Sequence, residues 1–333
     1  MALFAVLAAG CGGDEERPSG QIPVDSDPIA PSAYVKPLGA AVELDHALED
    51  DAYRKRLITT FTSITPENAM KWEIVEPERG EYDFGEADRL VQFAERTNKR
   101  VRGHPLVWDY QLPDWLEDKD WSAPELREVM REHITALMRR YRGRIDEWDV
   151  VNEPLGMHGG LKPSVWSRTL GPGYMAYAFQ VAHQTDPQAK LFLNELNAER
   201  PGPRARTLLA VARRLKESGV PIDGVGFEFH RTGTDAPSRR RIEELGRATA
   251  RMGLSFAITE LDVRDTAERR QAQVYGDAAT VCADSPNCTG VTVWGVTDRW
   301  SWLGADAAPL PFDEDGNPKP AFNALVDPFL KGV

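Results

Sequence analysis

Short apolar runs and amphipathic stretches alternate along the chain from about residue 33 to the C-terminus. The apolar runs are a few residues long and rich in Val, Ile, Leu and Phe, which is typical of buried strands in a parallel sheet. We predict eight such strands, over residues 35–42, 62–68, 100–108, 147–153, 191–196, 224–230, 255–262 and 290–296.

The stretches between these runs have the period of amphipathic helices. Residues 124–141 (PELREVMREHITALMRRY) and 204–218 (RARTLLAVARRLKES) place apolar side chains at i, i+3, i+4 and i+7. Eight strand-helix units predict a closed (β/α)8 barrel, the TIM barrel, rather than an open sheet. A single barrel domain over residues 33–333 also suits a chain of 333 residues, because such barrels typically need about 250.

Polar and aromatic side chains gather where the predicted strands end. In a barrel of this kind the carboxyl ends of the strands carry the functional site. The residues in these positions are Glu67, Asn68, His104, Trp108, Asn152, Glu153, Asn194, His230, Glu260 and Trp294.

Glu153 in EWDVVNEP and Glu260 in SFAITELDV each end a buried apolar run. A carboxylate is costly to bury, so two of them at the ends of separate barrel strands indicate a function. Hydrolysis of a glycosidic bond requires such a pair, since one acid protonates the departing oxygen and the other attacks or activates water. Strands 4 and 7 of a barrel are expected to hold the two carboxyl groups ~5 Å apart, the separation of retaining enzymes.

Three further side chains are predicted to support the pair. The amide of Asn152 can hold a sugar hydroxyl while Glu153 donates its proton. His230 can donate a hydrogen bond to Glu260, and Asp262, two residues beyond Glu260 on the same strand face, can orient that imidazole.

Several segments carry a resemblance to a known family. TPENAMKWEIVEPERGEYDF, VRGHPLVWDYQLPDW, WDVVNEP, ITELDV and GVTVWGVTDRWSWL, in this order over residues 35–330, resemble glycoside hydrolase family 10. The C-terminal PFDEDGNPKPAFNAL also resembles that family's closing segment. The resemblance implies a retaining endo-1,4-β-xylanase that acts on xylan or xylo-oligosaccharides.

Site residues follow from the resemblance position by position. Glu153 matches the acid/base, Glu260 the nucleophile, and Asn152, His230 and Asp262 the residues that support catalysis. The resemblance and the strand-end positions together imply substrate contacts from Glu67, Asn68, Lys71, His104, Trp108, Gln111, Asn194, Glu228, Trp294 and Trp302.

Three positions depart from the family pattern. Asp109 stands where His is usual, Glu228 stands where Gln is usual, and Glu195-Leu196 replace Asp-Tyr. Because negative charge raises the pKa of a nearby carboxyl group, we expect Asp109 and Glu228 to keep Glu153 protonated to higher pH. Glu228 could instead share a proton with Glu260 or shift the substrate preference, and the sequence does not rank these alternatives.

Composition and charge limit the partners. A net charge of −12 argues against nucleic-acid binding, which calls for basic patches. The spacing of His, Cys and acidic residues along the sequence matches no metal-ligand motif, so we expect hydrolysis without a cofactor. We also expect a monomer.

The N-terminal residues predict export. MALFAVLAAGC (1–11) resembles a lipoprotein signal that would leave Cys11 as a lipidated membrane tether, and residues 12–32 read as a flexible linker. A bacterial secreted or outer-surface lipoprotein is therefore expected. Cys282 and Cys288, six positions apart around a proline, could close a disulfide in an oxidising compartment, or could remain two free thiols.

Two other functions remain open at this stage. The chain could hydrolyse another β-glycan or an aryl glycoside, because fold and chemistry do not fix the sugar. It could also be a surface glycan-binding protein with impaired turnover, and only the departures around the site support that alternative.

Overall fold

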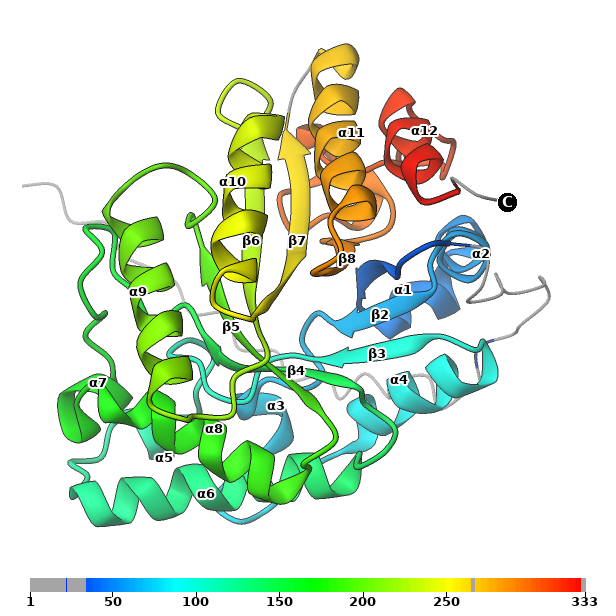
Figure 1. Cartoon of the computed structure of the whole chain (residues 1–333). Helices are drawn as coiled ribbons and strands as arrows, with labels where there is room; N and C mark the ends of the chain where they lie inside the picture. Colours follow the sequence, from blue (N-terminus) through cyan, green and yellow to red (C-terminus); the bar gives the residue numbers. More distant parts are fainter. Residues whose placement is uncertain (1–21, 23–33, 265–266, 331–333) are drawn as a thin grey trace, which may run out of the picture.

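The computed structural model describes residue 22, residues 34–264 and residues 267–330. Its centre is a closed barrel in which each strand pairs in parallel with the next and the last strand pairs with the first (Figure 1). The predicted barrel is confirmed. The strands are β1 (Leu38–Val42), β2 (Ser63–Pro66), β3 (Arg100–Gly103), β4 (Glu147–Asn152), β5 (Lys190–Leu196), β6 (Gly224–Thr232), β7 (Ser255–Arg264) and β8 (Cys288–Val293).

Helices surround the barrel and connect its strands (Figure 1). Both helices predicted from periodicity are present, as α6 and α9. The helices are α1 (Leu44–Glu49), α2 (Asp51–Thr60), α3 (Trp72–Val75), α4 (Gly85–Arg96), α5 (Asp114–Glu117), α6 (Ala123–Arg140), α7 (Val165–Leu170), α8 (Gly173–Thr185), α9 (Pro203–Glu217), α10 (Arg239–Ala250), α11 (Glu268–Asp284) and α12 (Pro320–Val326). Short 3-10 turns follow at Asp298–Trp300, Ala305–Ala307 and Asp327–Leu330.

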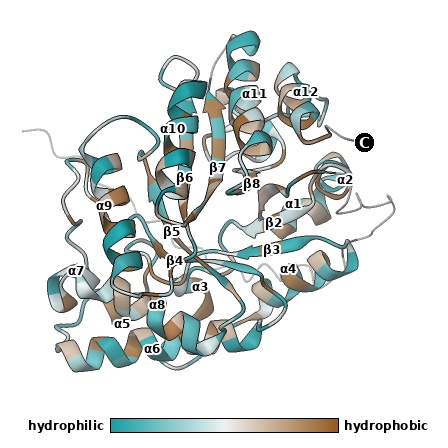
Figure 2. Cartoon of the chain, in the orientation of Figure 1, coloured by the Kyte–Doolittle hydropathy of each residue, from teal (hydrophilic) through white to brown (hydrophobic). Residues whose placement is uncertain are grey.

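Helix α6 shows how the sequence builds the outer layer. Ser122 and Glu125 form a reciprocal capping box at its start, which satisfies backbone N–H groups that would otherwise lack partners. Its apolar face, including Leu126, Ile134 and Leu137, is buried. Hydrophobic burial of this stripe holds the helix on the barrel, while hydrophilic residues cover the outer sides of the helices (Figure 2).

Strand β3 is shorter than predicted. We expected a strand over residues 100–108, but it ends at Gly103, two residues before Pro105. Pro105 has no N–H to donate to a regular ladder. Leu106 and Val107 still donate to the carbonyls of Asp149 and Val150, so the segment stays beside β4 and its next side chains reach the barrel rim.

The disulfide is formed between Cys282 and Cys288. It joins the end of α11 to the start of β8, at the amino end of that strand. No helix within the described ranges is long and apolar enough to cross a bilayer. Cys11, the signal-like segment and most of the linker lie outside the described residues, so the lipid tether and the export stay predictions. The monomeric state also stays a prediction.

Candidate active site

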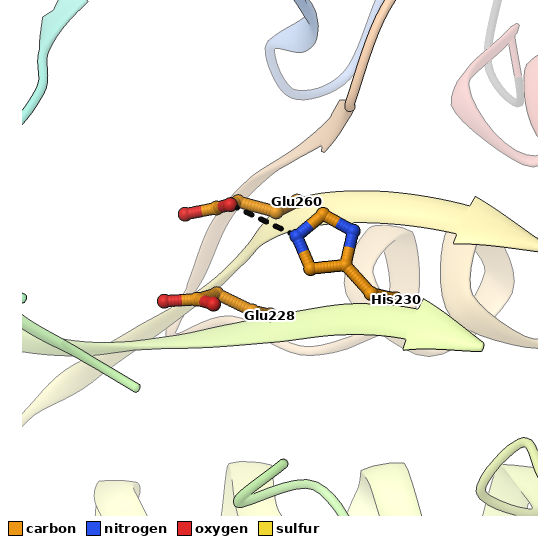
Figure 3. Close-up of side chains that lie close together, drawn as sticks. All are labelled: Glu228, His230 and Glu260. Carbon is orange, nitrogen blue, oxygen red and sulfur yellow. Dashed lines mark hydrogen bonds and ion pairs between the residues drawn. The ribbon is translucent and has the colours of Figure 1, made fainter. Parts of the chain in front are cut away.

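Glu260 lies in the carboxyl half of β7, which continues to Arg264, and its carboxylate is held on both sides. His230 Nε2 is 3.1 Å from Glu260 Oε2 (Figure 3). Asn194 Nδ2 donates to Glu260 Oε1 at 2.9 Å. His230 is itself anchored from behind, because its Nδ1 is 2.6 Å from Asp262 Oδ2. Both predicted contacts of His230 are therefore confirmed.

The charge state of His230 follows from these contacts. Burial alone would lower its pKa, but the charge and hydrogen bond of Asp262, together with Glu260, raise the pKa of His230 to about 10. The imidazole is therefore protonated at neutral pH and donates from both nitrogens. It stabilises Glu260 as the anion that a nucleophile must be.

Glu153 follows β4 in a strained backbone conformation. Its φ of +47° is in the left-handed region, which is unusual for a residue other than glycine and typical of functional sites. The Glu153 N–H donates to the carbonyl of Asn194 at 3.0 Å, which fixes the turn. Burial, and then the negative charge of Glu260, raise the pKa of Glu153. Glu153 therefore keeps its proton to higher pH than an exposed acid does.

Glu153 and Glu260 face one open cavity of about 640 Å³ at the carboxyl ends of the strands. Their surroundings push them toward opposite roles, a proton donor and an anion, which is how acid and base assignments are recognised. The cavity is lined by Glu67, Asn68, Lys71, His104, Trp108, Gln111, Asn152, Glu153, Leu196, Asn197, Glu228, His230, Glu260, Asp262, Arg264, Trp294, Trp302 and Leu303.

Asn194 lies beneath this cavity rather than on its wall. We expected it to contact substrate, but it is fully buried and absent from the lining. A side chain on Gly226 would meet the Asn194 amide oxygen at 2.0 Å, so the missing Cβ makes room for this amide. Thr259 Oγ1 donates to the same oxygen at 2.7 Å. Asn194 therefore supports the floor of the site.

The Asn194 amide nitrogen also contacts Glu228. Its two hydrogens face three oxygens at 2.8–2.9 Å, from Asn152, Glu228 and Glu260. Glu228 is 1% exposed and pairs across the strands with Glu260. Burial, then the charges of Glu260 and Glu153, raise the pKa of Glu228 well above its usual value.

Burial and these charges favour the protonated form of Glu228, which has the shape of the glutamine that it replaces. In that form Glu228 carries no charge that could hold a proton on Glu153. The negative charges that raise the pKa of Glu153 come from Glu260 and Asp109, and the contribution of Glu228 stays a prediction.

A polar group lies on the β2 side of the cavity. Lys71 Nζ donates to Asn68 Oδ1 at 2.9 Å, and Asn68 in turn donates to Glu43 Oε2 at 3.3 Å. Burial, then the charge of Glu43, raise the pKa of Glu67 to about 7. These donors and acceptors suit the hydroxyl groups of a sugar, as the sequence predicts.

The residues after β3 form the adjoining wall. His104 Nδ1 is 3.0 Å from Asp149 Oδ2. Lys71 Nζ lies 5.2 Å from the ring centre of Trp108, and Gln111 donates to Glu73 Oε1 at 3.0 Å. All three predicted residues line the cavity.

Two tryptophans, Trp294 and Trp302, line the cavity beside His230. Trp294 is mostly buried and packs edge-on against His104 and His230. Trp302 is 55% exposed, and its indole N–H donates to Asp262 Oδ2 at 2.8 Å. An exposed aromatic face beside the nucleophile is suited to packing on a sugar ring.

One neighbour of the acid/base was missed from the sequence. Lys162 follows the loop after β4, and its Nζ lies 3.7 Å from Glu153 Oε2 and 2.9 Å from Asp109 Oδ1. Nothing in the local sequence marks Lys162, because only the fold of the loop brings it back to Glu153. The remaining departures from the family pattern are Glu195 and Leu196. Glu195 is fully buried and accepts from the N–H of Leu155, whereas Leu196 lines the cavity.

Glu228, His230 and Glu260 each offer a potential metal ligand, and these atoms lie within 4.8 Å of one another (Figure 3). The cluster is not evident from the sequence, because only the pairing of β6 with β7 brings its members together. A cation bound there would occupy the nucleophile, and the proton on His230 competes for the same atoms. The cluster is therefore better suited to holding Glu260 as a nucleophile than to binding a metal ion.

A (β/α)8 barrel with a proton-donating acid and an anionic acid in one sugar-sized cleft defines a glycoside hydrolase. Comparison with known proteins agrees. The sequence model described as glycosyl hydrolase family 10 matches residues 29–328. Endo-1,4-β-xylanase B of Humicola insolens is 38% identical over 305 residues, which cover 86% of this chain and 82% of the relative. Endo-1,4-β-xylanase B of Thermotoga neapolitana is 37% identical over 280 residues, 80% of each chain.

Solved structures are similar over nearly the whole chain. Native xylanase 10B from Thermotoga maritima superposes with a TM-score of 0.84 and 34% identity, covering 89% of this chain and 95% of that one. Xylanase 10B from Thermotoga petrophila in complex with xylobiose gives a TM-score of 0.85 and 33% identity, covering 90% and 96%. The chain belongs to glycosyl hydrolase family 10.

Proposed function

We propose that this protein is a retaining endo-1,4-β-xylanase, which cleaves internal β-1,4-xylosidic bonds of xylan through a covalent glycosyl-enzyme. The observation that carries the proposal is the pair Glu153 and Glu260 in one cleft, with surroundings that favour a proton on the first and a charge on the second. The xylanase relatives and the xylobiose complex of a similar structure support xylan as the substrate.

In the first step Glu260 attacks the anomeric carbon of the sugar. The bond to the departing oxygen breaks while Glu153 gives that oxygen its proton. His230 and Asn194 hold the two carboxylate oxygens of Glu260, which fixes the direction of attack. The product is a sugar esterified to Glu260 and a shortened chain that leaves.

The second step reverses these roles. Esterification removes the negative charge of Glu260, which is the second largest cause of the raised pKa of Glu153. Glu153 therefore becomes a carboxylate more readily once the leaving group has gone. It takes a proton from water, the water oxygen attacks the anomeric carbon, and the bond to Glu260 breaks.

Endo action is favoured because the cleft is open and lined along its length. Polar contacts at Asn68 and Lys71 lie on one side and the exposed Trp302 on another, so several sugars can bind across the cleavage point.

Product analysis tests the proposal. The purified protein should release a series of xylo-oligosaccharides from plain xylan, with retained anomeric configuration seen by NMR. Glu260→Ala should lose at least ~10³-fold in kcat, because the nucleophile is gone. Faster hydrolysis of carboxymethylcellulose than of xylan would indicate another β-glycan as substrate. Binding of xylan without release of reducing ends would indicate a glycan-binding protein and contradict the proposal.

A further inference from the structure

The loop after β4 folds back and brings Lys162 beside Glu153, the acid/base. Leu155 and Leu161 pair as an antiparallel bridge, and the N–H of Lys162 donates to the carbonyl of Pro154 at 2.8 Å. Gly159 turns the loop with a φ of +80°, and a Cβ there would lie 2.7 Å from the backbone of Pro203. Backbone bonds thus fix the place of Lys162 independently of its side chain.

The Lys162 side chain lies between two carboxylates. Its Nζ is 2.9 Å from Asp109 Oδ1 and 3.7 Å from Glu153 Oε2. Asp109 and Glu153 are 13% and 15% exposed, and Lys162 21%, so water screens these charges only in part. Nζ also lies 4.1 Å from the ring centre of Tyr110, which shields another side of the ammonium group.

We propose that Lys162 and Asp109 act as a charge pair that sets the proton affinity of Glu153, Lys162 favouring its carboxylate and Asp109 restraining that effect. Both are positioning residues that act through Glu153. The inference rests on the proposed function, because it assumes that Glu153 is the acid/base.

The two members of the pair act on Glu153 in opposite directions. A cation at 3.7 Å stabilises the carboxylate and lowers the pKa of Glu153, while the anion of Asp109 raises it. Asp109 also draws the ammonium group toward itself, since the Lys162–Asp109 contact is 0.8 Å shorter (3.7 − 2.9) than the Lys162–Glu153 contact. Removal of Lys162 should therefore raise the pKa of Glu153, and removal of Asp109 should lower it.

Lys162 keeps its charge while Glu153 titrates. Burial alone would lower the pKa of Lys162, but the hydrogen bond and charge of Asp109, together with Glu153, raise it. Among the described residues, the other titratable or charged groups that interact with Glu153, Lys162 or Asp109 are Glu260, His230, Glu228, Glu195, Lys71, Tyr110 and Tyr174. None of these residues is substituted in the test below, so each variant differs from the wild type only at Lys162, at Asp109 or at both.

The pair fits the two-step cycle of a retaining enzyme. In the first step Glu153 needs its proton, and Asp109 with Glu260 helps to keep it. In the second step Glu153 needs its negative charge. Among the described residues, Lys162 is the cation found in contact with Glu153. A lysine that Asp109 holds slightly away can serve the second step without removing the proton needed for the first.

The test compares pH profiles of kcat/KM on xylo-oligosaccharides for four variants. Lys162→Met should move the alkaline limb to higher pH by about one unit, because an opposite charge at this range lowers a carboxyl pKa by about one to three units. Asp109→Asn should move it to lower pH by up to about one unit. Lys162→Arg, which keeps the charge, should restore a limb close to that of the wild type. The double variant Lys162→Met/Asp109→Asn should lie between the two single variants.

A purely structural role would not separate the variants in this way. Alkaline limbs of Lys162→Met and Asp109→Asn that move together, or that coincide with the wild type, would overturn the proposal. A ¹³C-NMR titration of the Glu153 carboxyl group in the same variants measures the pKa without turnover. It tests the charge pair even if the wild-type protein releases nothing from xylan, a result that would count against the proposed function alone.

Discussion

The position of each proton decides what the carboxyl groups of this site can do. Glu260 is an anion because a protonated His230 and an amide hold its oxygens. The pKa of Glu228, its neighbour across the strands, is raised because the residue is buried beside that anion and no ion pair to it is found among the described residues. When two carboxyl groups lie so close, ionisation of one opposes ionisation of the other, and the one with the cation keeps the charge.

A glutamine at position 228 should reproduce the neutral acid at low pH and differ from it at high pH. Once Glu228 ionises, its carboxylate repels that of Glu260 and competes with it for the Asn194 amide, which disturbs the alignment of the nucleophile. Glu228→Gln cannot ionise. As pH rises through the pKa of Glu228, the kcat/KM of the wild type should therefore fall relative to that of the variant, by up to about 100-fold for a misplaced reacting group.

The ratio of kcat/KM between Glu228→Gln and the wild type, followed from pH 5 to pH 10, measures this effect. A ratio that stays constant over the range would show that Glu228 does not titrate beside the nucleophile.

At the scale of elements, strand register and strand ends place the site. The β6–β7 register shifts between Phe227 and Glu228, so that Glu228 faces Glu260 and His230 faces Asp262. Such irregularities are frequent next to active sites, where they re-aim side chains. The opposite ends of the strands carry stability instead, and there α11 is tied to β8 by the Cys282–Cys288 disulfide.

Loss of this disulfide should destabilise the fold without changing the chemistry. Closing a loop of six peptide units restricts the unfolded chain, and the loop-entropy relation gives about 2 kcal/mol for a loop of this size. Cys282→Ala/Cys288→Ala should lower the free energy of unfolding by that amount in urea denaturation. Its kcat should stay that of the wild type, because the bond lies at the amino end of β8, away from the cleft.

Reduction of the wild-type protein with dithiothreitol is the matched control, since it opens the bond without adding cavities. An equal drop in kcat for the reduced and substituted proteins would contradict the separation of stability from catalysis.

For the whole molecule, the buried site makes stability depend on pH. The pKa of Glu67 is raised from 4.5 to about 7, and that of His230 from 6.5 to about 10. In both cases the folded state holds a proton that the unfolded chain has released, so folding is favoured at low pH within each window. Stability is lost as pH rises from 4.5 to 7 through Glu67, and from 6.5 to 10 through His230.

The melting temperature should therefore fall between pH 5 and pH 8, less steeply below pH 6.5, where the lowered pKa values of buried His46 and His133 act in the opposite direction. Lys99, with its pKa lowered by burial to about 8, acts in the opposite direction only above that pH, which sets the upper limit of the range. Differential scanning calorimetry at constant ionic strength gives the curve. Glu67→Gln should flatten it between pH 5 and pH 7, and a melting temperature that rises across the range would refute the linkage.

The order of apolar runs was enough to predict the barrel, because each buried strand of a parallel sheet needs a short apolar segment and each helix an amphipathic one. The strand-end positions of Glu153 and Glu260 were enough to predict the acid pair, since a closed barrel brings all carboxyl ends to one face. These features are local in the sequence, so they can be predicted without the tertiary structure.

Tertiary structure alone decided the rest. Lys162 contacts Glu153 only because a loop folds back, and Asn194 lies under the cleft only because Gly226 on the next strand leaves room. The raised pKa of Glu228 depends on its burial beside Glu260. Interaction energies between charges depend on distance and on exclusion of water, and sequence spacing fixes neither.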